Sequence, residues 1–184
     1  MKRLALLLIA GLALASCSND VDITRNLSAE DAAIVPYQSG QTIQFVNTIT
    51  NDTLNMTVTD DQTSIMRPSE EDEYTRFSVF HNDTYSYCRY LTLCDDYNLY
   101  RMFFIVRPDK KFDFTFRAYE EHKSVSIDFD LNKINPAPTT TIDGLDFNNV
   151  YYHNLEDGGT IAFSTEKGLI LIRTADSCAY RLIP

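Results

Sequence analysis

The sequence predicts an all-β protein, an antiparallel sandwich or open barrel-like meander of about ten strands. One observation is that apolar and polar residues alternate in several short runs, the period of strands with one buried face. A second is the supply of eleven Phe and eleven Tyr residues, which fit pleated, half-buried surfaces. A third is that almost no helical period occurs after Thr42.

The clearest hairpin lies near the middle of the chain. Aromatic and polar residues alternate over 112–118, and apolar and polar residues alternate over 124–131. The two runs are separated by the polar segment Glu120-Glu121-His122. This pattern predicts an antiparallel pair with one solvated face.

Two segments before this hairpin are apolar at both odd and even positions. They are residues 85–94 and 99–106, joined by the turn-forming run Asp95-Asp96-Tyr97-Asn98. Continuous apolar runs of this length are typical of strands buried on both faces. We therefore expect two central strands that are covered on both sides.

The remaining strands are short and are bounded by turn residues. A hairpin is expected around Asn51-Asp52, and the segment Asn132–Thr141, which holds two prolines, is expected to be a long crossing loop. The other predicted strands are residues 43–45, 54–58, 147–153, 160–165, 169–173 and 179–183.

The N-terminus carries the features of a lipoprotein signal peptide. Lys2 and Arg3 precede the apolar run Leu4–Ala15, which is too short to span ~30 Å of hydrocarbon. The run ends in Leu14-Ala15-Ser16-Cys17, which resembles the bacterial lipobox. The resemblance implies that Cys17 is acylated and becomes the first residue of the mature protein, anchored by ~0.8 kcal/mol per buried CH₂.

The predicted organisation is a signal peptide, a lipidated tether and one domain. Ser28-Ala29-Glu30-Asp31 predicts a capping box for one turn of helix in the tether, which Pro36 ends. The ranges are 1–16 for the signal, 17–36 for the tether and 37–184 for a single all-β domain.

The charge of the chain excludes one class of partner. The formal net charge is −10 and the isoelectric point is near 4.6. Nucleic-acid binding needs a basic surface that displaces counterions from phosphates. We therefore expect no nucleic-acid partner, and a membrane contact through the lipid anchor alone.

Three cysteines remain for the domain, in a compartment that permits disulfides. Cys88 and Cys94 lie six residues apart; on one extended strand they share a face but sit about 20 Å apart, too far to bond, unless a bulge or turn near Arg89–Thr92 brings them together. Cys178 could bridge to either. The other alternative is three buried thiols that act as small apolar side chains.

Motifs for catalysis or cofactor binding are lacking in the sequence. The three histidines form no metal-binding pair, and no nucleophile elbow is present. We therefore expect no metal, no cofactor and no catalytic residue of those classes. Two carboxylates could still cooperate in hydrolysis, because 26 acidic residues make close pairs inevitable.

The chain is rich in tyrosine, and this abundance indicates a surface that binds a ligand. Exposed tyrosines contact sugars or proteins through an apolar ring and a hydroxyl, although Tyr in sheets also simply pairs across strands. The candidate contacts are Tyr85, Tyr87, Tyr151 and Tyr152.

The C-terminal part of the chain resembles a known group. Residues 160–172, followed by Tyr180-Arg181-Leu182-Ile183, are similar to a recurring ending of small, uncharacterised Bacteroidota cell-envelope lipoproteins. The likeness covers about 40 residues from Leu145 onward, together with the lipobox. It implies an all-β domain at the outer membrane, either periplasmic or surface-facing, and no particular activity.

The expected function is therefore a non-enzymatic accessory or binding module of the envelope, with a glycan or an envelope protein as its ligand. The alternative is an envelope hydrolase that acts on glycan or peptide through an Asp/Glu site. A third alternative is a carrier of lipid or small ligands, which requires a hollow barrel lined by Phe and Leu.

Overall fold

A computed structural model of the chain describes residues 23–66, 84–119, 122–175 and 179–184. It confirms the all-β prediction, since every long element is a strand. The strands are β1 Ile23–Arg25, β2 Thr42–Asn47, β3 Thr53–Met66, β4 Thr84–Cys94, β5 Tyr100–Arg107, β6 Lys111–Ala118, β7 Lys123–Asp130, β8 Ala137–Ile142, β9 Leu145–Asn154, β10 Thr160–Ser164, β11 Gly168–Arg173 and β12 Ala179–Leu182, with one helical turn, α2 Ala29–Ala32.

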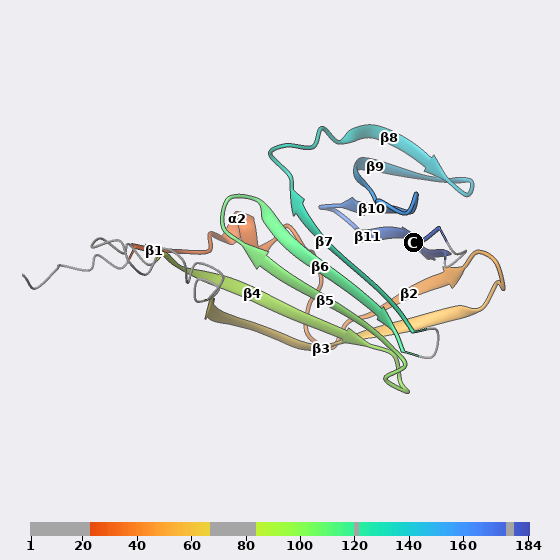
Figure 1. Cartoon of the computed structure of the whole chain (residues 1–184), viewed down its shortest axis with the longest axis horizontal. Helices are drawn as coiled ribbons and strands as arrows, with labels where there is room; N and C mark the ends of the chain where they lie inside the picture. The colour runs from red at the N-terminus through yellow and green to blue at the C-terminus, as the bar shows by residue number, and fades with distance from the viewer. Residues whose placement is uncertain (1–22, 67–83, 120–121, 176–178) are drawn as a thin grey trace, which may run out of the picture.

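The strands form one antiparallel meander that curls into a half-barrel (Figure 1). Their order is β7-β6-β5-β4-β3-β2-β12-β11-β10-β9-β8, and β1 adds to β4 in parallel. The curl brings the β7 end of the sheet over its C-terminal strands. The Phe129 ring on β7 lies 5.6 Å from the His153 ring on β9 and 5.9 Å from the Phe163 ring on β10.

Aromatic rings fill the space between the two halves of the sheet. Phe112 on β6 is fully buried, and its ring centroid lies 4.7 Å from that of Phe129 and 4.6 Å from that of Phe163. The Phe104 ring lies 6.2 Å from that of Phe112 and 4.9 Å from that of Phe114. The alternation over 112–118 thus supplies the core, as predicted. A packed interior of this kind argues against the carrier alternative, which needs a hollow one.

Arg89 on β4 joins the segment before β2 to the sheet. Its Nε and one Nη donate to both Asp61 carboxylate oxygens at 2.8 Å. The remaining N–H groups donate to the backbone oxygens of Ala32 at 2.7 Å, Val35 at 2.9 Å and Tyr37. All five guanidinium donors are therefore used, and the chain that leads into the domain is held against β3 and β4.

The predicted capping box is confirmed at this junction. The Asp31 backbone N–H donates to the Ser28 hydroxyl oxygen at 3.0 Å, and that hydroxyl donates to the Asp31 carboxylate at 2.7 Å. The second Asp31 oxygen accepts from the Lys110 backbone N–H at 2.9 Å. The helical turn is thereby attached to the β5–β6 turn.

The hairpin of β8 and β9 differs from the prediction, which placed a crossing loop over 132–141. The turn residues Asp143 and Gly144 both have positive φ, 49° and 80°, the geometry of a tight hairpin turn. Asp143 pairs with Arg181 on β12 at 3.3 Å. The hairpin end thus reaches across β10 and β11, on the side away from the core.

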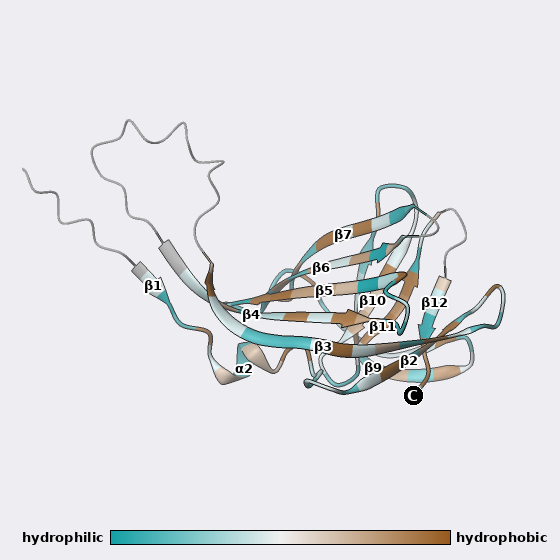
Figure 2. Ribbon diagram, turned by 90° about the horizontal axis from the view of Figure 1, so that it is seen from below, coloured by the Kyte–Doolittle hydropathy of each residue, from teal (hydrophilic) through white to brown (hydrophobic). Residues whose placement is uncertain are grey.

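The strand pair β4 and β5 also corrects the sequence analysis. Leu91, Leu93 and Phe104 are buried on the inner face, but Phe103 and Ile105 on the other face are only half-buried. The sequence predicted that these two strands are covered on both faces. In the structure the core covers only one face of each. β3 and β4 also extend beyond the rest of the sheet as an arm, where β1 pairs (Figure 2).

Candidate functional site

The strongest candidate site is the outer face of β4–β7, the side of these strands that points away from the core. Strand pairing places three rows of outward side chains next to one another. From β4 to β7 the rows are Tyr90, Ile105, Asp113 and Asp128; then Thr92, Phe103, Thr115 and Ser126; then Cys94, Arg101, Arg117 and Ser124.

The middle of the outer face is apolar and slightly hollowed. A depression of about 280 Å³ is lined there by Tyr90, Phe103 and Ile105, with the hydroxyls of Thr92 and Thr115 at its sides. Both rings and Ile105 remain half-exposed. In Figure 2, hydrophobic residues colour β4 and β5 over much of their length. An apolar centre with hydroxyls beside it can contact a flat, polyhydroxylated ligand.

Two aspartates face each other at one end of the outer face. Asp113 and Asp128 are cross-strand partners, and one Nη atom of Arg107 lies 2.8 Å from the first carboxylate and 2.7 Å from the second. Burial raises the pKa of Asp113; the Arg107 charge opposes that shift and the Asp128 charge adds to it. The pair can accept hydrogen bonds, and Asp113 holds a proton more readily than an ordinary aspartate.

Two arginines face each other at the opposite end. Arg101 and Arg117 are cross-strand partners on β5 and β6. The Arg101 guanidinium lies 5.6 Å from the centre of the Tyr119 ring, and that of Arg117 lies 5.4 Å from the centre of the Phe103 ring. Cation–π contacts at these distances hold the two side chains over the sheet.

The sequence-predicted tyrosines do not form one surface. Tyr87 is 36% exposed on the β3–β4 arm, and only the backbone of Tyr85 is described. Tyr151 and Tyr152 lie on β9, which five intervening strands separate from β4 in the sheet order, and both pack partly against the core. Being adjacent on a strand, they point to opposite faces. Whether any of the four contacts a ligand stays a prediction.

A second hollow lies under the end of the β8–β9 hairpin and includes one of these tyrosines. This cleft has a volume of about 490 Å³ and is lined by Tyr152, Asn154, Arg173, Asp143 and neighbouring side chains. The Tyr152 hydroxyl donates to Thr140 at 3.0 Å, and Asp143 is neutralised by Arg181.

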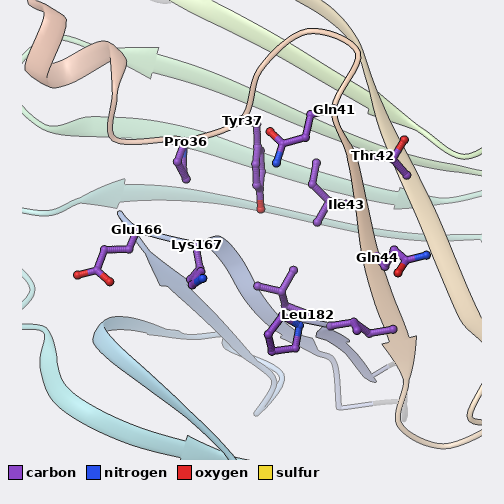
Figure 3. A pocket seen from close by; sticks show the side chains of 11 residues that line it. Pro36, Tyr37, Gln41, Thr42, Ile43, Gln44, Glu166, Lys167 and Leu182 are labelled. Carbon is purple, nitrogen blue, oxygen red and sulfur yellow. The ribbon is translucent and has the colours of Figure 1, made fainter.

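A third hollow, of about 420 Å³, lies where the chain enters β2 (Figure 3). Part of its polar lining is engaged within the protein, while Lys167 also lines it. The side-chain oxygen of Gln41 accepts from the Gln38 backbone N–H at 3.0 Å, and the side-chain amide of Gln44 donates to the Asn55 side-chain oxygen at 2.9 Å. The Tyr37 hydroxyl in its wall accepts from the Leu169 backbone at 2.7 Å.

The cysteines are placed as the spacing predicts. Cys88 and Cys94 lie on β4, point to the same face and are both buried, free thiols. Burial raises the pKa of the Cys88 thiol, which makes it a poor nucleophile. Cys178 and Cys17 lie outside the described residues, so a bridge to Cys178 and the acylation of Cys17 stay predictions.

Within the described ranges, no three His, Cys, Asp or Glu side chains converge as a metal site would require. In the same part of the chain, no helix has the length and apolar character to cross a membrane.

The signal for the outer face was present in the sequence as strand alternation. Arg101, Phe103 and Ile105 occupy alternate positions of one strand, so they share a face. The tyrosines that the sequence analysis singles out do not coincide with this mixed face. Comparison with protein-family models, with curated proteins and with solved structures returns no match to this chain.

Proposed function

We propose that the protein is a non-enzymatic glycan-binding module of the bacterial cell envelope, and that the outer face of β4–β7 is its binding surface. The observation that carries the proposal is the pair of half-exposed rings, Tyr90 and Phe103, in a depression bordered by hydroxyls. Aromatic faces pack on the apolar face of a sugar ring, while hydroxyls and carboxylates bind its OH groups.

The size of the surface favours a glycan over a protein partner. A specific protein interface takes about 20–30 residues from each side. The depression has eight lining residues and about 280 Å³, close to the lower limit of ~300 Å³ for small-molecule pockets. A surface of that size suits a few sugar units, bound weakly.

An anchor at the outer membrane is part of the proposal and rests on the sequence. Leu14-Ala15-Ser16-Cys17 follows a charged and then apolar N-terminus, which is the arrangement of a lipoprotein signal. The acyl chains would attach the module to the membrane while the acidic domain stays in water. Labelled palmitate should enter the wild type and not the Cys17→Ala variant; equal labelling of both would contradict the anchor.

Removing the two rings tests the binding surface. We expect the double variant Tyr90→Ala, Phe103→Ala to bind its glycan at least about tenfold more weakly, because the stacking contacts are lost. The measurement is retention on a panel of neutral and acidic oligosaccharides, followed by calorimetry on those retained. The matched control is Tyr87→Ala, on the same strand but on the opposite face. It should bind like the wild type; weaker binding would instead favour the contact at Tyr87 that the sequence predicts.

Two results would contradict this proposal. One is unchanged glycan binding by the double variant, and the other is retention of no oligosaccharide at all. Capture of an envelope protein that depends on Tyr90 and Phe103, with no glycan bound, would move the ligand to the protein class and also contradict it.

The alternative function, an envelope hydrolase, has one observation in its favour. Asp113 and Asp128 are close together, and the pKa of Asp113 is raised by burial, as for the acid of a carboxylate pair. Arg107 bridges both carboxylates, however, and so engages the oxygens that would attack a substrate. Release of reducing ends by the wild type and not by Asp113→Asn would establish the hydrolase.

A further inference from the structure

Two like charges stand directly opposite each other on the outer face, in a protein whose net charge is −10. Arg101 and Arg117 are cross-strand partners, and like charges in that position destabilise a sheet. Neither forms an ion pair with another described residue. The pair therefore costs stability without a charge that compensates it in the described part of the protein.

The geometry leaves the donors of this pair available. Each guanidinium lies over a ring, at 5.6 Å for Arg101 on Tyr119 and 5.4 Å for Arg117 on Phe103. A guanidinium that contacts a ring through its planar face keeps the N–H groups on its edge for hydrogen bonds. The Arg101 Nε atom, like those of Arg107 and Arg181, is buried and has no hydrogen-bond partner among the described residues, a condition that buried donors rarely keep.

The acidic residues of the outer face do not neutralise the pair. Asp113 is four residues from Arg117 on the same strand, about 13 Å away at ~3.3 Å per residue. That distance exceeds the Debye length of ~8 Å at physiological ionic strength. Asp113 and Asp128 are moreover bound to Arg107. The two ends of the outer face thus have opposite character, because one holds two carboxylates and one guanidinium and the other holds two guanidinium groups.

We propose that the glycan bound on the outer face carries an anionic group, a carboxylate or a sulfate, held between Arg101 and Arg117. This inference rests on the proposed function and specifies its ligand class. The anion would relieve the repulsion between the two cations and supply an acceptor for their N–H groups. Phe103 couples the two contacts, because it lies under Arg117 and also lines the depression for the sugar ring.

The test compares matched ligands by calorimetry at about 0.15 M salt. The first pair is a trigalacturonate and its methyl ester, and the second is a sulfated dextran oligosaccharide and its unsulfated parent. The protein variants are Arg101→Gln with Arg117→Gln, and Arg173→Gln as the matched loss of an exposed arginine elsewhere. We expect at least one anionic ligand to bind at least about tenfold tighter than its neutral form.

That preference should vanish in the double arginine variant and persist in Arg173→Gln. The anionic group is identified by which of the two ligands, the carboxylate or the sulfate, shows this preference. Equal binding of neutral and anionic forms would overturn the inference and leave the proposed function standing. A preference that survives the loss of both arginines, or that is lost in Arg173→Gln, would also overturn it. Failure of all four ligands and of the wider panel would overturn both proposals.

Discussion

Replacing Arg89 with alanine is expected to lower the free energy of unfolding by about 3–5 kcal/mol, the cost of breaking a buried ion pair from one side. The Arg89 side chain is 14% exposed and that of Asp61 is 20% exposed. The substitution leaves Asp61 without its counter-charge, and it removes the donors to the backbone oxygens of Ala32, Val35 and Tyr37. Chemical denaturation followed by circular dichroism measures the loss.

Two controls make the Arg89 result specific. Arg25→Ala breaks the ion pair with Asp109, whose side chains are 57% and 60% exposed, and should cost less than about 1 kcal/mol. Arg89→Lys keeps the charge but not the five donors, so its loss should be intermediate. Equal losses in Arg89→Ala and Arg25→Ala would show that Arg89 does not hold the entering chain to the sheet.

The same ion pair has a predictable pH dependence. Hydrogen bonds from Arg89 hold the pKa of Asp61 below its ordinary value of 3.8. A lowered pKa in the folded state means that the stabilisation is complete above pH ~4 and is lost as the pH falls through the folded pKa. The free energy of unfolding of the Arg89→Ala variant should therefore fall less on acidification than that of the wild type.

Replacing Phe112 with alanine is expected to cost about 3–5 kcal/mol of unfolding free energy, as for other buried Phe-to-Ala substitutions. The Phe112 ring is fully buried and packs against both Phe129 and Phe163. Phe112 and Phe129 come from one half of the curled sheet and Phe163 from the other. The substitution would therefore open a cavity at the contact between the two halves. Denaturant titration measures the change in the midpoint and in the free energy.

Phe103→Ala is the matched control, because Phe103 lies on the neighbouring strand β5 with its ring on the outer face. Its ring is half-exposed, so less apolar surface returns to water and the loss should be under half that of Phe112→Ala. The same titration of the double variant Tyr90→Ala, Phe103→Ala would show whether the protein used for the glycan measurement remains folded. Equal losses would contradict the division of the sheet into a core face and an outer face.

Much of the strand pattern could be predicted because alternation reports burial directly. The run over 112–118 alternates because β6 has one face in the core and one on the surface. β8 was missed for the opposite reason. β8, Ala-Pro-Thr-Thr-Thr-Ile, is an edge strand with little buried surface. Its residues therefore do not alternate between apolar and polar, and the sequence resembles that of a loop. The Asp143-Gly144 turn beside it was the usable signal.

The candidate site was harder to predict because it depends on strand register. Alternation alone places Arg101 and Phe103 on one face, but the pairing of Arg101 with Arg117 is set by the β5–β6 turn. The curl of the sheet is likewise a property of long-range packing between Phe112 and Phe163. Adjacent Tyr151 and Tyr152, in contrast, could have been separated from sequence alone, since neighbours on a strand point to opposite faces.

The most direct test of glycan binding by the outer face is a titration of the ¹⁵N-labelled protein with trigalacturonate, followed by amide chemical shifts. Binding there predicts shifts concentrated on β4, β5 and β6, around Thr92, Phe103 and Thr115, with the Arg101 and Arg117 amides among the largest. Shifts that cluster instead in the cleft lined by Tyr152 and Arg173, or that form no contiguous surface, would contradict it.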